Sequence, residues 1–418
     1  MDQTILLPNG VRICTEAVSG VRSAALGIWV GTGSRHEKAG ENGAAHFIEH
    51  MVFKGTQRRT AAALAEEMDA IGGQVNAFTT KECTCFHARV LDAHLPLATD
   101  ILCDMFFSSR FAEEDVETER GVILEEIGMY EDNPEDLCAE RLALEVYRGS
   151  SLARPILGRK ATLSKMTGEW LRTYMREHYR PDRIVVSLAG SFRNQDVEEL
   201  KARFSALEPG RSPAGRPGAY RAAFTLKKKA IEQNHLTLAF PGLPYGDERR
   251  FALQLLSTTL GGGMSSRLWQ EVREKRGLCY SVYSYTAGHA ETGLFAIYTA
   301  LGREMEEEAL RTICAAVRDY AEHGISEEEL SRAREQAKAN ILMGLESTQA
   351  RMSHMGRGEL LYGRVLTPDE IIGGYDAVER EQIRALAREL FDFHQVSLSA
   401  VGRVGSEEMY RAILEKGD

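Results

Sequence analysis

The chain has 418 residues, of which 43% are hydrophobic and 27% are charged, and its formal net charge is −10. This length exceeds one ordinary domain and suggests roughly two to four. The composition is that of a soluble globular protein, and no stretch approaches the roughly 18 to 20 apolar residues that span a bilayer. Because nucleic-acid binding depends on basic patches, the acidic balance argues against it, and we expect neither nucleic acid nor a membrane as partner.

Two features of the sequence predict a cytoplasmic location. The N-terminal stretch lacks the basic start and apolar run of a signal peptide, and it lacks the Arg- and Ser-rich character of a transit peptide. The seven cysteines are scattered and include no C-x-x-C pair, which is typical of reduced thiols.

The first distinctive motif in the chain is His46-Phe47-Ile48-Glu49-His50. On a helix, four residues turn the chain through about 400°, so that His46 and His50 share one face with Glu49 beside them. The flanking residues are apolar nearly all round, which indicates a buried helix rather than an amphipathic one with exposed histidines. Two imidazoles and a carboxylate that can take a proton from water are what a catalytic zinc site requires. The order H-x-x-E-H is the inverse of the commoner H-E-x-x-H protease motif.

Strands and helices alternate through the first half of the chain. Apolar and β-branched runs predict strands at 23–30, 83–90 and 184–189. Helical periodicity predicts helices at 60–71, 92–107, 112–130 and 168–178.

The helix predicted at 112–130 offers a third metal ligand. A catalytic zinc ion normally has three protein ligands and one open position. Seven residues of helix turn about 700°, which places Glu119 and Glu126 on one face and turns Glu125 about 100° away. From the helix alone, either Glu119 or Glu126 fits the role.

The middle of the chain reads as a linker between two related halves. Residues 208–218 include six Pro or Gly and have no apolar period. Three segments of the first half recur in the same order in the second, as with Ser187-Leu188-Ala189-Gly190 and Ser399-Ala400-Val401-Gly402. We therefore predict two homologous domains from a tandem duplication, each an α/β or α+β sandwich with helices over a sheet. The fold class that we assign is α+β, two homologous α/β sandwich domains with helices packed on mostly antiparallel sheets. The expected division is an N-terminal domain at 1–207, a linker at 208–222 and a C-terminal domain at 223–418.

The second half repeats the alternation of elements. Strands are predicted at 236–240 and 294–299, and helices at 305–322 and 326–346. The helix expected at 253–260 corresponds to the H-x-x-E-H helix but contains no such motif. We therefore expect one metal ion per chain.

The H-x-x-E-H motif, followed 76 residues later by Glu126 in the run E-R-x-V-I-x-x-E, resembles the pitrilysin family of inverted zincins. That family includes insulin-degrading enzyme and the mitochondrial processing peptidases. The resemblance implies that His46, His50 and Glu126 bind Zn²⁺ and that Glu49 is the general base. It also implies that Glu119 orients the ligands without binding the metal itself.

Two further segments are similar to elements of the same family. Gly72-Gly73-Gln74-Val75-Asn76-Ala77-Phe78-Thr79 resembles its substrate-binding edge strand, which assigns substrate contacts to Asn76, Ala77 and Phe78. Arg273 and Tyr280 match its R-x6-Y element, which holds the substrate and stabilises the developing oxyanion. The internal repeat places Tyr280 at the position of Asn76.

The resemblance implies a zinc-dependent metalloendopeptidase that cleaves extended peptides or unfolded presequence-like segments within a closed chamber. The chain has about half the length of the four-domain members, so the resemblance also implies a homodimer, or a dimer with a related chain. The alternative is a non-catalytic scaffold or assembly subunit, like the core proteins of respiratory complexes. Such subunits usually have a degraded metal motif, whereas every motif residue is present here.

Overall fold

The computed structural model describes residues 3–415, which form two compact units. The first unit comprises the described residues up to Ile127 together with Arg154–Arg216 and Met343–Leu366. The second comprises Gly128–Ala153, Pro217–Leu342 and the described residues from Thr367 onward. The segment 208–223 contains neither helix nor strand. Within residues 3–415, no helix combines the length and hydrophobicity needed to cross a bilayer.

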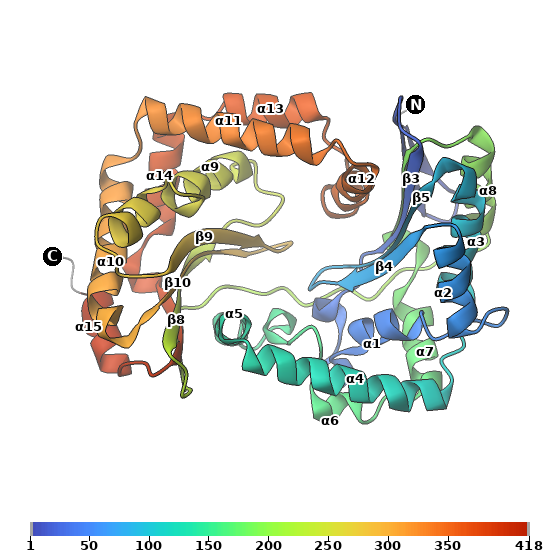
Figure 1. Cartoon of the computed structure of the whole chain (residues 1–418), viewed down its shortest axis with the longest axis horizontal. Coiled ribbons are helices and arrows are strands. Elements are labelled where there is room, and N and C mark those ends of the chain that lie inside the picture. Colours follow the sequence, from blue (N-terminus) through green and yellow to red (C-terminus); the bar gives the residue numbers. More distant parts are fainter. Residues whose placement is uncertain (1–2, 416–418) are drawn as a thin grey trace. The chain divides into compact units, whose positions relative to one another are not determined.

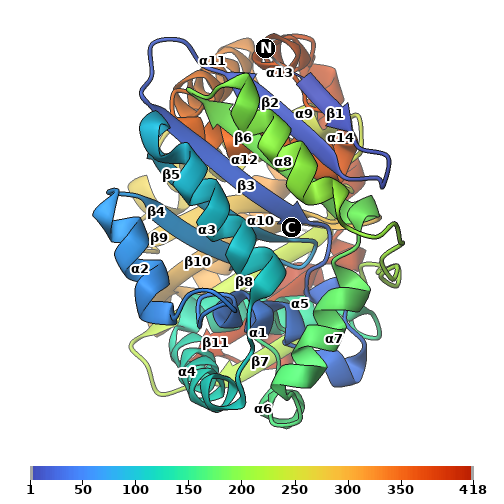
Figure 2. The same ribbon diagram turned by 90° about the vertical axis from the view of Figure 1, so that its right-hand side faces the viewer.

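The first unit is built on a six-stranded sheet, seen face-on in Figure 2. Its strands, in spatial order, are β1 (Gln3–Leu6), β2 (Arg12–Ala17), β6 (Ile184–Gly190), β3 (Ser23–Val30), β5 (Thr84–Leu91) and β4 (Gln74–Thr79). Only β2 and β6 pair in parallel, and the other neighbours are antiparallel. Strand β4 lies at one edge of the sheet.

Helices cover both faces of the first sheet. One face packs against a large apolar core that includes Phe47, Ile101 and Leu171. The helices on that side are α1 (Ala44–Met51), α2 (Ala61–Ala70), α3 (Leu95–Ser108), α7 (Gly168–His178) and α8 (Asn194–Ser205). The other face packs against α12 (Thr348–Tyr362), whose Met352 and Met355 contact a core that includes Trp29. Figure 1 shows α12 on one side of β3 and β5, with α2, α3 and α8 on the other.

The second unit has a five-stranded sheet that repeats the order of β2, β6, β3, β5 and β4. Its strands, in spatial order, are β7 (Phe224–Lys228), β11 (Ser397–Gly402), β8 (Gln233–Gly242), β10 (Gly293–Gly302) and β9 (Ser281–Gly288). Here β7 and β11 form the parallel pair, as β2 and β6 do in the first unit. The remaining neighbours are antiparallel. The matching strand orders confirm the predicted α+β class with two related, mostly antiparallel sheets.

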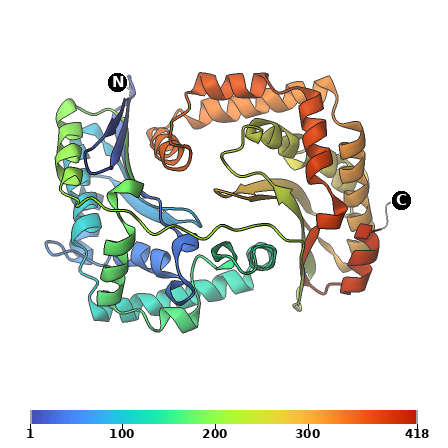
Figure 3. The ribbon, with the colours of Figure 1, turned by 180° about the vertical axis from the view of Figure 1, so that it is seen from behind.

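The second sheet is also covered on both faces. Helices α9 (Arg250–Gly261), α10 (Glu306–His323), α14 (Arg380–Leu390) and α15 (Glu407–Glu415) gather on one side, where the last three are orange to red in Figure 3. Helix α5 (Pro134–Val146) packs on the opposite face, where Leu142 and Val146 contact Ala239 and Ala296. Two further helices, α6 (Lys160–Leu163) and α13 (Pro368–Asp376), are short.

Each unit takes one covering helix from the other half of the sequence. Helix α5 lies in the first half of the sequence but belongs to the second unit. Helix α12 lies in the second half but belongs to the first unit. Helices α4 (Glu113–Asp132) and α11 (Glu327–Gly344) carry the chain from one unit into the other. The sequence repeat predicts the two sheets, but it does not indicate this exchange.

The strand registers correct one detail of the internal repeat. Ser187 in β6 and Ser399 in β11 are equivalent positions of the repeat. When the pairings are followed from strand to strand across the first sheet, Ser187 leads to Asn76 in β4. In the second sheet, the same procedure leads from Ser399 to Tyr283 in β9. The expected equivalence of Asn76 with Tyr280 is therefore wrong by three residues, because the segment before the edge strand differs in length between the halves.

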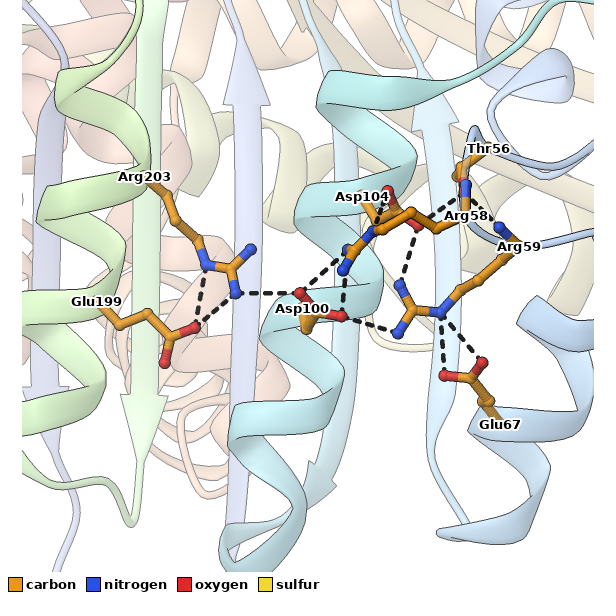
Figure 4. Close-up of polar contacts among 8 residues, drawn as sticks. All are labelled: Thr56, Arg58, Arg59, Glu67, Asp100, Asp104, Glu199 and Arg203. Carbon is orange, nitrogen blue, oxygen red and sulfur yellow. Dashed lines mark hydrogen bonds and ion pairs between the residues drawn. The ribbon is translucent and has the colours of Figure 1, made fainter.

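A network of ion pairs fixes the outer side of the first unit, where α3 lies between α8 and the loop that follows α1 (Figure 4). Asp100 on α3 pairs with Arg58, Arg59 and Arg203 at 2.7–3.1 Å. Asp104 pairs with Arg58 and Arg59 at 3.1 and 2.9 Å. The outer members of the network are Thr56, Glu67 and Glu199. The network ties the loop after α1 to three helices that cover the sheet, α2, α3 and α8.

We expect Asp100→Asn to destabilise the protein at neutral pH and to have less effect in acid. Burial opposes the charge of Asp100, but hydrogen bonds from Arg59, Arg58 and Arg203 outweigh it and lower its pKa to about 2. A folded pKa below the unfolded value of about 3.9 means that the stabilisation is present above that value and is lost as the pH falls toward 2. Urea unfolding at several pH values measures this. An equal difference at pH 7 and pH 3 would contradict the assignment.

Candidate active site

Helix α1 buries a polar motif in an apolar core. Ala44, Phe47, Ile48 and Met51 are fully buried, as the flanking sequence predicts. His46 lies among them with only 6% of its surface exposed. Since burying polar groups is unfavourable unless they find partners, this short helix requires partners for its polar side chains.

The two histidines of α1 converge with a glutamate of α4. The imidazole rings of His46 and His50 lie 4.7 Å apart, as their spacing on one helix face predicts. Glu126 Oε2 lies 3.5 Å from His46 Nε2 and 3.6 Å from His50 Nε2. Each residue offers one ligand atom, and these atoms lie within 4.8 Å of one another. Among the residues that the structure describes, this is the only group of histidines, cysteines or acidic residues able to hold a metal ion in this way.

The geometry of this cluster fits a zinc ion. Zinc bonds of about 2.0–2.2 Å in a tetrahedral arrangement place neighbouring ligand atoms about 3.4 Å apart. The separations from Glu126 Oε2 to the two imidazole nitrogens match this value. Glu126 Oε2 is buried and forms no hydrogen bond within residues 3–415, so a cation would supply its missing partner. Burial lowers the pKa of His46 to about 4, with a further contribution from His50, so that its imidazole is neutral and able to bind metal at pH 7.

The second nitrogen of His50 is held by α4. Glu119 Oε2 lies 3.0 Å from His50 Nδ1, and Glu119 itself is 3% exposed. The other carboxylate oxygen, Oε1, pairs with Lys54 Nζ at 2.5 Å. Burial opposes a proton on His50, but the Glu126 and Glu119 carboxylates outweigh it and raise its pKa. Glu119 therefore orients the ring so that Nε2 faces Glu126.

Glu49 lies beside the cluster and is held by strand β4. Thr79 Oγ1 donates a hydrogen bond of 2.6 Å to Glu49 Oε2, which leaves Oε1 without this donor. Burial raises the pKa of Glu49, while the bond from Thr79 acts in the opposite direction. A half-buried carboxylate with a raised pKa is suited to accept and return a proton.

Strand β4 presents the three predicted substrate residues on two faces. Asn76 and Phe78 point to the side that packs against α12, where the Phe78 ring meets Trp29 edge-on at 5.6 Å. Ala77 lies on the other side with Thr79 and packs against the core beneath α1. Asn76 is exposed, and its side-chain oxygen accepts a hydrogen bond from the Ala77 amide at 2.8 Å. Within the described chain, β4 pairs only with β5, so its other edge is open, as the resemblance predicts.

Arg273 and Tyr280 belong to the second unit, where they lie side by side. Arg273 is on a six-residue π-helix, Trp269–Glu274, a conformation that is frequent at functional sites. Its guanidinium carbon lies 4.0 Å from the Trp269 ring centroid and 5.5 Å from that of Tyr280. Tyr280 is 71% exposed and precedes edge strand β9. The pair thus presents a cation and a phenol at the start of an open sheet edge.

Two residues without a predicted role, Thr79 and Lys54, lie beside the cluster. Thr79 is the last residue of the edge strand, and only the pairing of that strand beside α1 shows that it reaches Glu49. Lys54 follows His50 by four residues, so the two side chains share one side of the chain if the helix continues to Lys54. We did not expect a helix of that length.

The fold and the cluster define a class: a metalloprotease-like protein with an inverted zinc motif on a duplicated α+β scaffold. Residues 12–160 match the sequence profile described as insulinase, peptidase family M16, and residues 165–337 match the one described as the peptidase M16 inactive domain. The chain belongs to the M16 peptidase family.

Similar proteins cover nearly the whole chain. The uncharacterized zinc protease YmxG of Bacillus subtilis is 44% identical over 402 residues, which is 95% of this chain and 98% of that protein. An uncharacterized zinc protease of Streptomyces coelicolor is 43% identical over 97% of this chain and 90% of its own. The crystal structure of a peptidase M16 inactive domain from Pseudomonas fluorescens has the same fold, with a TM-score of 0.89 at 21% identity over 97% of this chain and 99% of that one. The crystal structure of a protease from Helicobacter pylori has a TM-score of 0.88 at 20% identity, over 96% of this chain and 99% of that one.

We expect Glu119→Gln to weaken zinc binding by about 10- to 100-fold, because the amide is a poorer partner for the His50 ring than the carboxylate. The dissociation constant can be measured by competition with a chromogenic chelator. Glu125→Gln is the matched control, since Glu125 lies on the same helix and is exposed. Equal affinity in the two variants would show that Glu119 does not support the ligand.

Proposed function

We propose that this protein is a zinc-dependent endopeptidase that hydrolyses extended or unfolded peptide segments. The observation that carries the proposal is the convergence of His46, His50 and Glu126 at ligand separations suited to zinc, with Glu49 beside them. The names of the whole-length relatives support the zinc and protease assignments.

In this proposal, His46, His50 and Glu126 hold one Zn²⁺ per chain. When bound, the ion supplies Lewis-acid chemistry, polarising the scissile carbonyl and making water more acidic. Glu49 accepts a proton from the attacking water at its carboxylate and returns it to the leaving amine. The Thr79 hydroxyl fixes one oxygen of Glu49, so the other is available for this transfer. Glu119 keeps the His50 ring in its tautomer and orientation.

The open edge of β4 is the proposed substrate site. A peptide added alongside this strand would form main-chain hydrogen bonds, which give affinity with little dependence on sequence. Asn76, Ala77 and Phe78 are the nearest residues of that strand, and Thr79 connects it to Glu49. An unfolded substrate satisfies this geometry because its backbone groups are free to pair.

We further propose a closed chamber formed by a homodimer, or by a dimer with a related chain. The proposal rests on the family resemblance and on the chain length, and it gives Arg273 and Tyr280 their role. From a partner subunit, they would hold the substrate and donate to the developing oxyanion. A cytoplasmic location remains part of the proposal.

We expect Glu49→Gln to retain zinc and lose peptide cleavage by a factor of at least 10², because the amide cannot accept the proton. The test measures bound zinc by elemental analysis and cleavage of unstructured peptides of graded length. Glu66→Gln, an exposed substitution on α2, is the control. Equal cleavage by Glu49→Gln and the wild type would refute the mechanism.

The same experiment separates the enzyme from the scaffold alternative. Wild-type protein without stoichiometric zinc and without chelator-sensitive cleavage would favour a scaffold. An upper limit on substrate length would support a closed chamber, and equal cleavage of short peptides and large unfolded proteins would count against it.

We expect mixtures of Glu49→Gln and Tyr280→Phe proteins to recover activity if Arg273 and Tyr280 act across a dimer. Random exchange makes half of the dimers mixed, each with one intact site, so the mixture should reach about a quarter of wild-type activity. Subunit exchange is verified by mass spectrometry of differently tagged chains. No recovery despite exchange would show that each site is built within one chain.

A further inference from the structure

Glu37 is a buried carboxylate at the start of the helix that carries the metal motif. It is 2% exposed and lies seven residues before α1, in the segment that leads from β3 to the helix. Its Oε1 accepts a hydrogen bond from the Ala45 amide at 2.9 Å, and its Oε2 accepts one from the Gly43 amide at 2.8 Å. Asn42 Nδ2 donates a third, at 3.0 Å.

These bonds replace a cap that the helix lacks. The first amides of any helix have no partner within it, and an N-cap side chain usually satisfies one of them. The N-cap residue here is Gly43, which has no side chain and adopts a left-handed conformation with φ of 100°. Glu37 therefore takes the capping role from outside the helix. Burial raises the pKa of Glu37 to about 7, while the hydrogen bonds from Asn42, Ala45 and Gly43 act in the opposite direction.

The neighbouring segment 154–162 holds this arrangement in place. Asn42 Nδ2 also donates to the Pro155 carbonyl at 2.8 Å, and Thr162 Oγ1 donates to the Asn42 carbonyl at 2.7 Å. The Arg154 guanidinium donates to the Glu37 carbonyl. Gly158 approaches so closely that a Cβ on it would lie 2.6 Å from the Asn42 carbonyl oxygen and from Gly43 Cα. The start of α1 is thus bound on several sides.

Small movements of this first turn would reach the metal cluster directly. Ala45, which Glu37 binds, immediately precedes His46, and the whole helix has only eight residues. A rotation of α1 moves His46, Glu49 and His50 together, while Glu126 stays on α4. The separations of 3.5 and 3.6 Å between Glu126 and the histidines therefore depend on how α1 is held.

We propose that Glu37 is a positioning residue for the metal site, fixing the rotation of α1 so that both histidines face Glu126. This inference rests on the proposed function, because the positions matter only if the cluster binds zinc. Glu37 itself contacts neither the ligand atoms nor Glu49. Its effect passes through the backbone amides of Gly43 and Ala45.

The test compares Glu37→Gln with a matched control, Glu306→Gln. Glu306 is also a buried carboxylate, 4% exposed, and it accepts bonds from a backbone amide, Gly405, and from the side chains of Asn234 and Tyr410. It belongs to the second unit, so its loss removes a similar set of bonds without touching α1. Each metal-free protein is first checked for thermal unfolding, and zinc affinity is then measured well below the transition.

We expect Glu37→Gln to bind zinc about 10-fold or more weakly than the wild type, with a changed visible spectrum of the Co²⁺-substituted protein, and Glu306→Gln to match the wild type in both. Cleavage by zinc-saturated Glu37→Gln should show a lower kcat with little change in KM. Wild-type zinc affinity and an unchanged Co²⁺ spectrum in folded Glu37→Gln would overturn the inference. Absence of zinc binding by the wild type would instead refute the proposed function.

A second variant covers the case in which Glu37→Gln does not fold. Asn42→Ala removes one of the three donors to Glu37 and leaves both backbone bonds. We expect a smaller decrease in zinc affinity, about 2- to 5-fold, in the same direction. In that case, a zinc affinity and a Co²⁺ spectrum equal to those of the wild type in folded Asn42→Ala would overturn the inference.

Discussion

Burial of ionisable side chains on an eight-residue helix is the constraint on which the rest of the site depends. Helix α1 places His46 and Glu49 among fully buried apolar residues, where a charge or an unpaired polar atom is costly. The surrounding elements supply partners to Glu49, to His50 and to the start of the helix. Strand β4 supplies a hydroxyl to Glu49, α4 supplies a carboxylate to each ring nitrogen of His50, and Glu37 accepts hydrogen bonds from amides at the start of the helix.

The sequence predicts this site well because its main signals are local. Two histidines four apart require only a helix to come together, and the apolar flanks indicate burial. The strand and helix boundaries follow for the same reason, since periodicity is a property of short segments. The strand at 23–30 and the helix at 168–178 begin and end at the predicted residues.

The features that sequence reasoning missed depend on contacts distant along the chain. No local pattern shows that Thr79 lies beside Glu49, since this follows from the order of strands in the sheet. The choice between Glu119 and Glu126 stayed open for a similar reason. Both occupy one face of α4, and only the placement of α1 against that face decides which carboxylate meets both imidazoles. Hydrophobic periodicity also does not predict the exchange of α5 and α12 between the units.

The duplicated scaffold meets the same burial constraint in two ways. In the second unit, α9 occupies the position of the motif helix in the repeat, and its buried residues are apolar apart from Ser257 and Thr259. The two hydroxyls bond within the unit, Ser257 to Ser284 and Thr259 to main-chain carbonyls. The buried hydroxyls of this helix therefore need no metal ion as a partner.

The exchange of helices has a consequence for the order in which the protein is made. A ribosome completes all strands of the first sheet by residue 190, but the helix that covers one of its faces begins only at residue 348. Until then, apolar residues of that face such as Trp29, Val185 and Ala189 lack their final cover. A gene truncated at the midpoint would therefore encode a sheet with one bare face and a helix, α5, without its sheet. The two halves share one strand order, but each needs a helix from the other half to cover its sheet.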